Sequence, residues 1–431
     1  MKVAFYTLGC KTNQFETQAL ERLFAERGHT VVDFKEMSDV YVINTCTVTA
    51  LGDKKSRAAA RQAKKRNPAA ILIVCGCYAQ VSPDEVRTLC GADIVLGSSG
   101  KGQIVELAEQ ALAGAVLTPD IPPALSAKPF EQLPAGGLLG RTRALLKVQD
   151  GCQNFCAYCL IPFARGPSRS IPPDGAVREC ARLEQDGYRE VVVTGIEISS
   201  YGLDLPQKSS LLELAPALCA AAPHTRIRLG SLEPRTVTEE FARALIVHGN
   251  LCPHFHLSLQ SGCDRTLRAM GRRYDTARFL LSCDILRRYF PGCAITTDLI
   301  VGFPGETEED FLQTLDFLSR AAFAQVHVFP YSRRKGTRAY SMPGQVDRAE
   351  RESRARRASG VCAQTRIQYL QSRVGQTAQV LFEQPDGAGH FCGHDMQYCP
   401  VRASGAALSG QVRAVRIISA DEKGLCGQVI D

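Results

Sequence analysis

The sequence lacks the features that mark membrane and exported proteins. No apolar run reaches the roughly eighteen residues that a transmembrane helix needs. The first residues do not form a basic segment followed by a long apolar core, so no export signal is predicted. We therefore expect a soluble, cytoplasmic protein without a membrane partner.

The chain also lacks a strong excess of one charge. Lys and Arg number 51 against 44 for Asp and Glu, a net charge of +7 that permits an anionic partner without requiring one. The composition is globular, with 45% hydrophobic and 22% charged residues, and 431 residues predict two or three domains. In a reducing compartment, eighteen cysteines indicate metal chemistry and buried apolar positions rather than disulfides.

Three of these cysteines, Cys152, Cys156 and Cys159, have the spacing C-x3-C-x2-C just after the apolar run 144–148. A four-iron cluster needs one ligand per iron, so three local thiolates leave one iron open for a substrate or cofactor. Zinc is the alternative, but the next cysteine is Cys180 and no second pair follows at a finger-like distance. The spacing favours an iron–sulfur cluster over zinc or unliganded cysteines.

The first 118 residues alternate short apolar runs with helical patterns, which predicts a parallel α/β sheet. Cys10, Cys46 and Cys77 each follow a predicted strand, and such strand ends lie side by side in an open parallel sheet. We predict a second cluster at these three thiols, the alternative being three buried small residues. Cys75 is expected to point into the core, and Cys77 to lie in a loop. The basic helix that follows Cys46 would contact phosphates or form a solvated surface.

The rest of the chain is predicted to form a linker and two further domains. Residues 119–140 are rich in Pro and Gly and indicate a linker. Residues 141–372 contain six strand–helix units, which predict an incomplete parallel barrel with its site at the strand ends. After an arginine-rich helix, residues 373–431 contain five short strands, which predict a small OB-like barrel. The predicted strands of the central domain are 144–148, 190–194, 226–229, 254–259, 295–301 and 325–329.

Several motifs resemble a known family. The pattern C-x3-C-x-Y-C, with Tyr158 before the last cysteine, resembles the radical S-adenosylmethionine (SAM) superfamily. The continuation L-I-P-F-A-R-G-P-S-R-S at 160–170 is similar to methylthiotransferases, as are the segments 8–17, 44–49 and 76–80 around the other three cysteines. The resemblance implies an N-terminal Rossmann-like α/β domain, a partial (β/α)6 radical SAM barrel and a C-terminal TRAM barrel.

The resemblance also implies two [4Fe-4S] clusters and two uses of SAM. The cluster at Cys152, Cys156 and Cys159 would cleave one SAM to a 5′-deoxyadenosyl radical that removes a substrate hydrogen. The auxiliary cluster at Cys10, Cys46 and Cys77 would deliver sulfur, which a second SAM methylates.

Further residues are expected to contact SAM or an anion. The resemblance places these residues around SAM: Tyr158, Gly195, Glu233, Ser258, Gln260, Gly302 and Val328. Because guanidinium groups suit bidentate anion contacts, Arg165 and Arg169 are candidates for the SAM carboxylate or a substrate phosphate, the alternative being surface positions. Where the family has His or Asn, this chain has Glu197, so the role of that position is undefined.

The opening motif predicts the substrate. L-G-C-K-T-N-Q-F-E-T resembles the subgroup that acts on N6-threonylcarbamoyladenosine at position 37, next to the tRNA anticodon. Relatives that modify isopentenyladenosine more often show Y-G-C-Q-M-N, and those that modify an aspartate of a ribosomal protein show L-G-C-P-K-N. We expect a monomer that forms 2-methylthio-N6-threonylcarbamoyladenosine, binds the tRNA anticodon stem-loop and accepts electrons from a low-potential donor such as flavodoxin or ferredoxin.

Two readings from other classes stay open at this point. A non-catalytic, two-cluster electron carrier bound to RNA would need no SAM site. A radical SAM methyltransferase without sulfur insertion would not need Cys10, Cys46 or Cys77.

Overall fold

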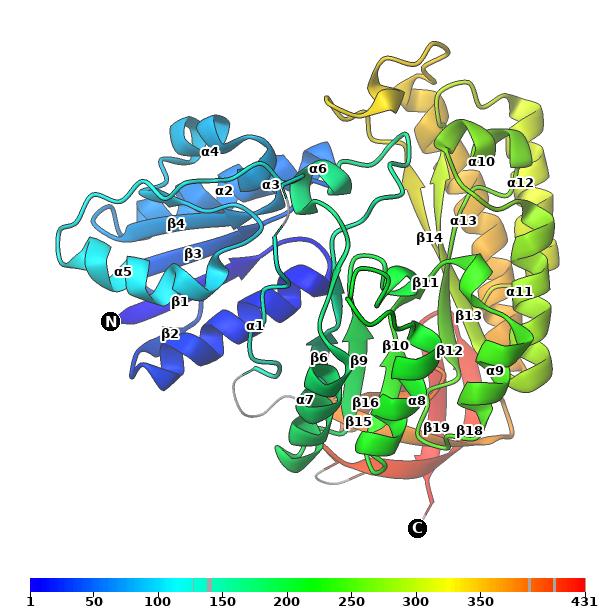
Figure 1. Cartoon of the computed structure of the whole chain (residues 1–431). Helices are drawn as coiled ribbons and strands as arrows, with labels where there is room; N and C mark the ends of the chain where they lie inside the picture. The colour runs from blue at the N-terminus through cyan, green and yellow to red at the C-terminus, as the bar shows by residue number, and fades with distance from the viewer. Residues whose placement is uncertain (127, 138–141, 387–388, 406–407, 431) are drawn as a thin grey trace.

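The computed structural model describes residues 1–126, 128–137, 142–386, 389–405 and 408–430, and it forms three successive units (Figure 1). The α/β fold class with a small C-terminal β-barrel is confirmed. The predicted domain boundary between residues 140 and 141 lies outside the described residues, as does residue 431. Within the described ranges, no helix is both long and apolar enough to cross a membrane.

The first unit is a parallel sheet of five strands in the order β2-β1-β3-β4-β5. Its strands are β1 (Lys2–Thr7), β2 (Thr30–Val32), β3 (Val40–Thr45), β4 (Ile71–Gly76) and β5 (Ile94–Val95). Its helices are α1 (Lys11–Glu26), α2 (Ala50–Arg66), α3 (Cys77–Val81), α4 (Pro83–Cys90), η1 (Lys101–Gln103) and α5 (Ile104–Leu112). The short strand β2 was not predicted.

Helices cover both faces of this sheet. Helices α1 and α5 pack on one face through residues such as Phe24 and Ile104, and α2 and α4 pack on the other through Ala60 and Val86. Every residue of the central strand β3 is buried, as expected of a parallel strand covered on both sides. Only the ends of the strands are therefore free to carry a site.

The second unit is an open barrel whose parallel strands follow chain order. All six predicted strands are present, in two sheets, β10-β9-β6 and β11-β12-β13-β14. An isolated bridge links Ile227 of the first sheet to Leu251, which lies shortly before β12. The strands are β6 (Arg143–Lys147), β9 (Glu190–Thr194), β10 (Arg226–Leu229), β11 (Ser231–Leu232), β12 (His254–Gln260), β13 (Ala294–Val301) and β14 (Gln325–Pro330).

Helices line the outside of this open barrel (Figure 1). They are α7 (Pro173–Gln185), α8 (Leu211–Ala221), α9 (Glu239–Ile246), α10 (Asp264–Met270), α11 (Thr276–Tyr289), α12 (Glu308–Ala321) and α13 (Arg348–Gln371). Short elements near the strand ends are β7 (Gln149–Asp150), α6 (Ile161–Arg165), β8 (Arg169–Ser170), η2 (Ile198–Ser200), η3 (Pro234–Thr236) and η4 (Arg338–Tyr340).

The inner face of the barrel is partly open to solvent. Along the second half of β12, His256, Ser258 and Gln260 are accessible, and the residues between them are buried. A strand turns successive side chains to opposite faces, so one face of β12 is closed by the helices and the other lines a concave surface.

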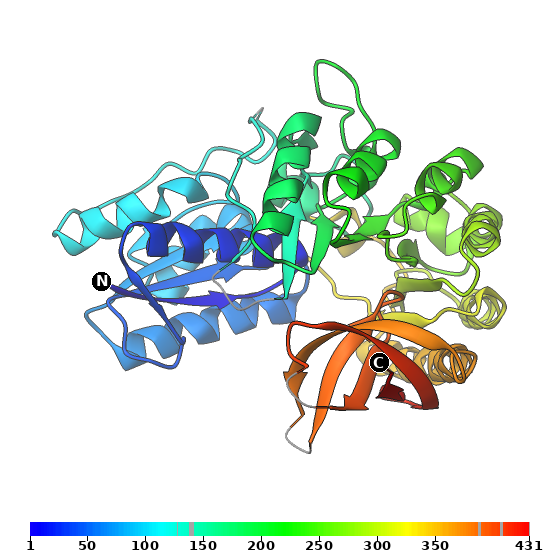
Figure 2. The ribbon, with the colours of Figure 1, turned by 90° about the horizontal axis from the view of Figure 1, so that it is seen from below.

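The third unit is a closed barrel in the order β15-β16-β17-β19-β18 (Figure 2). Its strands are β15 (Thr377–Pro385), β16 (His390–Asp395), β17 (Pro400–Ser404), β18 (Val412–Asp421) and β19 (Gly424–Val429). It lies against the amino ends of the central strands, where Arg143 donates to the Tyr398 hydroxyl at 3.0 Å and Arg226 to the Gln379 carbonyl at 2.9 Å. The carboxyl ends of the strands stay clear of it.

Candidate active site between the two α/β units

The three N-terminal cysteines follow neighbouring strands. Cys10 precedes α1 just after β1, Cys46 directly follows β3, and Cys77 directly follows β4. Since β1, β3 and β4 are adjacent, all three residues lie at one edge of the sheet. The expected loop position of Cys77 is wrong, because this residue begins helix α3. Cys75 points into the core, as predicted.

The chain around Cys10 and Cys46 is tightly packed. Gly9 has a φ of +104°, and a Cβ atom there would lie 2.9 Å from the Cys46 sulfur, so only glycine fits. Asn13 donates to the carbonyls of Leu8 at 2.7 Å and Thr45 at 2.8 Å. One amide group therefore holds the ends of β1 and β3 together.

In the Cys152 loop, each sulfur accepts a hydrogen bond. The backbone of Asn154 donates to Cys152 at 3.5 Å, and that of Ile161 to Cys159 at 3.4 Å. The third sulfur, of Cys156, receives the Arg272 guanidinium at 3.2 Å. Similar donors face Cys46 (the Val48 backbone) and Cys77 (the Arg165 guanidinium).

These donors suit sulfur that carries negative charge. Burial raises the pKa of Cys152 to about 11 and that of Cys159 to about 12, so the free thiols would keep their protons at neutral pH. A coordinating metal displaces the thiol proton, and the surrounding N–H groups then stabilise the thiolate. The donor set therefore fits metal-bound thiolates better than free thiols.

The spacing of the thiols argues against a single metal ion. Among the described residues, no three His, Cys, Asp or Glu side chains converge closely enough to hold one ion. A zinc ion needs its ligands around one point, whereas each thiolate of an iron–sulfur cluster binds its own iron. Within the described ranges, the side chains therefore give no support to a site for a single zinc ion.

A pocket of about 290 Å³ lies between the first two units. One wall is the segment 47–49, directly after Cys46, and the other is the segment 158–161, which includes Cys159. The strands β12, β13 and β14 also contribute to its lining, through Gln260, Asp298 and Phe329. The cavity is thus lined by one cysteine of the barrel, Cys159, and by the segment that directly follows Cys46.

Two of the predicted SAM residues, Tyr158 and Gln260, line this pocket. Gln260 has a φ of +69°, and Phe155 in the cysteine loop has a φ of +47°. Such backbone conformations are uncommon outside glycine and gather at functional sites. Ser258 lies on the same accessible face of β12 as Gln260.

The other predicted SAM residues lie around the pocket without lining it. Gly195 lies against Gln149, and Glu233 pairs with Arg235 at 2.9 Å. Gly302 is covered by Arg351 of α13, since a Cβ there would lie 2.2 Å from that side chain. The side chain of Val328 packs against the core, and its neighbour Phe329 lines the pocket instead. The expected place of Gly302 and Val328 beside the adenine stays a prediction.

Position 197 has a definite environment. Glu197 accepts a hydrogen bond from the Asn154 side chain at 3.2 Å, so it touches the Cys152 loop. Burial, together with the nearby Glu233, raises the pKa of Glu197 to about 7. Its carboxyl group is therefore poised between its neutral and charged forms at neutral pH.

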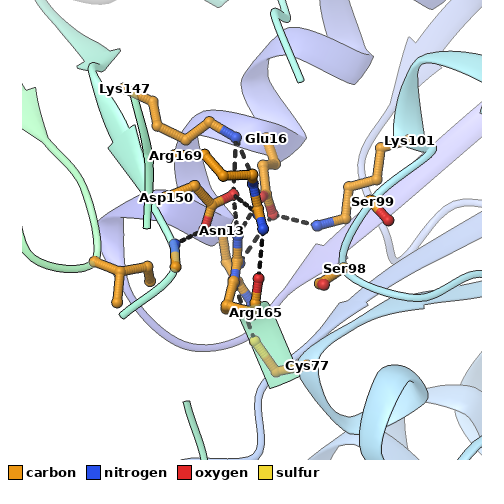
Figure 3. Close-up of polar contacts among 12 residues, drawn as sticks. Asn13, Glu16, Cys77, Ser98, Ser99, Lys101, Lys147, Asp150, Arg165 and Arg169 are labelled. Atoms are coloured by element: carbon orange, nitrogen blue, oxygen red, sulfur yellow. Dashed lines mark hydrogen bonds and ion pairs between the residues drawn. The ribbon is translucent and has the colours of Figure 1, made fainter. Parts of the chain in front are cut away.

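Arg165 and Arg169 are neither surface residues nor pocket residues. Both are buried, and Arg165 bonds Asn13, Glu16, Cys77 and Asp150 (Figure 3). Arg169 donates to the Arg165 carbonyl at 2.7 Å and pairs with Asp150. Protein groups occupy the donors of Arg165, which speaks against the expected contact of that residue with a SAM carboxylate or a phosphate. For Arg169 that contact stays a prediction.

Comparisons with known proteins identify the family. Residues 146–318 match the model of the Radical SAM superfamily, and residues 2–97 match Uncharacterized protein family UPF0004. The threonylcarbamoyladenosine tRNA methylthiotransferase MtaB of Bacillus subtilis (strain 168) is 37% identical, over 97% of this chain and 94% of that protein. The chain belongs to the radical SAM methylthiotransferase family.

Other members of this methylthiotransferase family carry two different names. The MtaB protein of Aquifex aeolicus (strain VF5) is 38% identical over 88% of this chain and 92% of that protein. The tRNA-2-methylthio-N(6)-dimethylallyladenosine synthase of Pelotomaculum thermopropionicum is 31% identical over 99% of this chain and 97% of that protein. This methylthiotransferase is thus an enzyme that transfers a sulfur-containing group and uses SAM and [4Fe-4S] chemistry, as predicted.

Solved structures match the fold at lower identity. The radical SAM methyltransferase TsrM of Kitasatospora setae, with cobalamin and a [4Fe-4S] cluster bound, superposes with a TM-score of 0.57 at 15% identity. The match covers 79% of this methylthiotransferase and 77% of TsrM, and at this identity it supports the fold alone.

The sequence did not reveal Arg272, Asn13 or Glu16 as site residues. Arg272 lies 116 positions from Cys156, to which it donates, and Glu16 lies 149 positions from Arg165. No local pattern signals such contacts, although Asn13 and Glu16 fall inside the opening motif that carried the resemblance.

Proposed function

We propose that this chain converts N6-threonylcarbamoyladenosine at position 37 of tRNA to 2-methylthio-N6-threonylcarbamoyladenosine. The observation that carries the proposal is the pocket with Cys159 in one wall and the segment after Cys46 in the other. A methylthiotransferase must bring a hydrogen-abstracting group and a sulfur donor to one carbon atom. Cys159 lines this cavity, and so does the segment that directly follows Cys46.

In this proposal the two groups of thiols hold different clusters. Cys152, Cys156 and Cys159 hold the radical SAM cluster, and Cys10, Cys46 and Cys77 hold the auxiliary cluster. The first supplies a 5′-deoxyadenosyl radical from SAM, and the second supplies sulfur that a second SAM methylates. The chain's own residues bind and orient the reactants.

The pocket residues would position SAM and the nucleoside. Tyr158 supplies an aromatic face and Gln260 supplies an amide beside Cys159, with Ser258 further along the accessible face of β12. Arg272 orients the cluster loop through Cys156. The apolar Ile300 and Phe329 exclude water from the reacting centre.

The choice of nucleoside rests on the opening motif. Relatives named for threonylcarbamoyladenosine are 31–38% identical, and those named for dimethylallyladenosine are 31–36% identical, so identity alone favours neither strongly. The sequence L-G-C-K-T-N-Q at residues 8–14 matches the first subgroup and lacks the Q-M-N of the second.

The partners follow from this activity. The anticodon stem-loop would approach over α2, which begins directly after the pocket wall and exposes Lys54, Lys55, Arg61 and Lys65. Cleavage of SAM requires a low-potential donor such as flavodoxin or ferredoxin. We further propose that the chain acts as a monomer in the cytoplasm.

Nucleoside mass spectrometry of tRNA from a deletion strain tests the substrate. Loss of 2-methylthio-N6-threonylcarbamoyladenosine, with its unmodified precursor accumulating and the dimethylallyl nucleoside unchanged, is the expected result. Unchanged levels of the threonylcarbamoyl product would contradict the assignment.

Replacing Cys10, Cys46 and Cys77 with Ala tests whether the two proposed clusters have separate roles. We expect 5′-deoxyadenosine to form on reduction while methylthiolation is lost. A methyltransferase without sulfur insertion would keep full activity, and an electron carrier would form no 5′-deoxyadenosine even in the unmodified chain.

A further inference from the structure

Six buried charged residues meet where the first unit contacts the open barrel (Figure 3). Glu16 and Lys101 come from the first unit, and Lys147, Asp150, Arg165 and Arg169 come from the barrel. Each side chain is at most 7% exposed. We call this group the interface ion cluster.

Arg165 is the centre of the interface ion cluster. Its Nη1 donates to Glu16 at 2.5 Å and to Asp150 at 3.2 Å. Its Nη2 donates to Asn13 and to the second oxygen of Glu16, and its Nε donates to the Cys77 sulfur at 3.4 Å. All five donors of this guanidinium therefore have protein partners.

The interface ion cluster carries surplus positive charge. Among the described residues, its ion pairs join four cations to only two carboxylates, Glu16 and Asp150. Buried charge without a counter-charge costs several kcal/mol, so an anionic neighbour is expected. Deprotonated Cys77, together with Cys10 and Cys46, would supply negative charge at this place.

The local backbone places Arg165 with little freedom. It ends the short helix α6, which packs beside α3, the helix that begins with Cys77. The next residue, Gly166, has a φ of +77°, and a Cβ there would lie 1.9 Å from the Ala124 carbonyl oxygen. The Arg-Gly pair thus lets the connector segment pass directly over the end of α6.

We propose that Arg165 is a positioning residue for the auxiliary centre. It holds the Cys77 sulfur through its Nε–H group, supplies positive charge to the thiolates, and fixes α1 and α3 against the barrel. This inference deepens the proposed function and rests on the assignment of Cys77 as a cluster ligand. Through Arg165, the loop that carries Cys159 and the helix that carries Cys77 become one rigid unit.

Arg165→Gln and Arg169→Gln form a matched pair of variants. Both remove one buried positive charge from the interface ion cluster, but only Arg165 contacts Cys77. The full-length chain with Cys152, Cys156 and Cys159 replaced by Ala would hold the auxiliary centre alone. In that background, the reduction potential and electron paramagnetic resonance spectrum report on that centre directly.

A donor and a positive charge beside a ligand sulfur stabilise the reduced, more negative cluster. We therefore expect Arg165→Gln to move the potential to more negative values than Arg169→Gln does and to change the spectrum. Arg165→Lys keeps the charge, so its reduction potential should lie closer to that of the protein with Arg165. This variant replaces Arg165→Gln in the comparison if the Gln variant does not fold. In the otherwise unmodified enzyme, Arg165→Gln should lower methylthiolation by about 10- to 100-fold while 5′-deoxyadenosine formation persists.

Equal potentials and spectra for the two Gln variants would overturn the role of Arg165 and leave the cluster assignment intact. If the background chain bound no iron or labile sulfide, the assignment of Cys77 would fail, and this inference with it. The two failures are thus distinguishable in the same set of proteins.

Discussion

The contact between Glu16 and Lys101 permits a quantitative test of the interface ion cluster. Lys101 is fully buried, and its ammonium group pairs with Glu16, which also binds Arg165. Both members of the pair belong to the first unit, in α1 and η1, but Glu16 also pairs with Arg165 and Lys147 of the barrel, so its removal weakens the contact between the units as well. The perturbation is Glu16→Gln, Lys101→Met, and the two together.

The expected magnitude follows from burial and charge. Burial alone would raise the pKa of Glu16, but Arg165, Lys101 and Lys147 outweigh it and lower that pKa from 4.5 to about 2. That difference is equivalent to about 3 kcal/mol of stability at neutral pH. Glu16→Gln leaves the buried Lys101 without this counter-charge, which costs about 3–5 kcal/mol. Lys101→Met should cost less, because Glu16 keeps its pairs with Arg165 and Lys147.

The double variant should lose much less than the sum of the two single losses. Removing one negative and one positive charge leaves the net charge of the interface ion cluster unchanged, so we expect a coupling of about 3 kcal/mol. Urea unfolding of the metal-free protein, followed by circular dichroism because the chain has no tryptophan, measures each variant. Single losses that add to within about 0.5 kcal/mol would refute the reasoning.

Three further predictions concern pH, the cysteine loop and the C-terminal barrel. Since the pKa of Glu16 is lowered, its contribution to the free energy of unfolding is complete above pH 4.5 and is lost as the pH falls towards 2. Over that range, the urea midpoint of Glu16→Gln should therefore change less with pH than that of the unmodified protein. Because burial raises the pKa of Glu197 to about 7, 5′-deoxyadenosine formation should depend on pH around that value. Glu197→Gln should keep most of this activity and remove its pH dependence near 7. An unchanged pH profile of the variant would contradict this. Tyr398→Phe deletes the hydroxyl that accepts a hydrogen bond from Arg143, and it should destabilise the docking of the third unit by about 1.5–3 kcal/mol. Hydrogen exchange in the described residues between 377 and 429 should then be faster. Exchange at the rate of the unmodified protein would rule this out.

The sequence was sufficient for the strands and for the placement of the cysteines. Apolar runs and their spacing are local properties, and they predicted the six central strands to within one residue at most ends. Parallel topology then placed Cys10, Cys46 and Cys77 after neighbouring strands, because the ends of neighbouring strands in one sheet are adjacent.

Side-chain direction and distant charge pairs were not predictable in the same way. Val328 and Phe329 differ by one position on β14, and that single step decides which of them faces the pocket. Arg165 was expected at an anion because its chemistry allows it, but the carboxylate that it binds comes from a helix 149 residues earlier. Nothing in one sequence states which distant carboxylate meets which guanidinium.

Two arginines of the barrel, Arg165 and Arg334, join the two α/β units. Arg165 binds Cys77 and α1, and Arg334 pairs with Asp53 at 2.6 Å and donates to Thr47 at 2.6 Å. Thr47 directly follows Cys46, so each arginine acts at or next to one of the N-terminal cysteines. Misplacement by about 1 Å can cost a reaction roughly a hundredfold. If the first unit carries the sulfur donor, as proposed, then fixing this unit at two points beside its own cysteines would keep the sulfur aligned with the barrel.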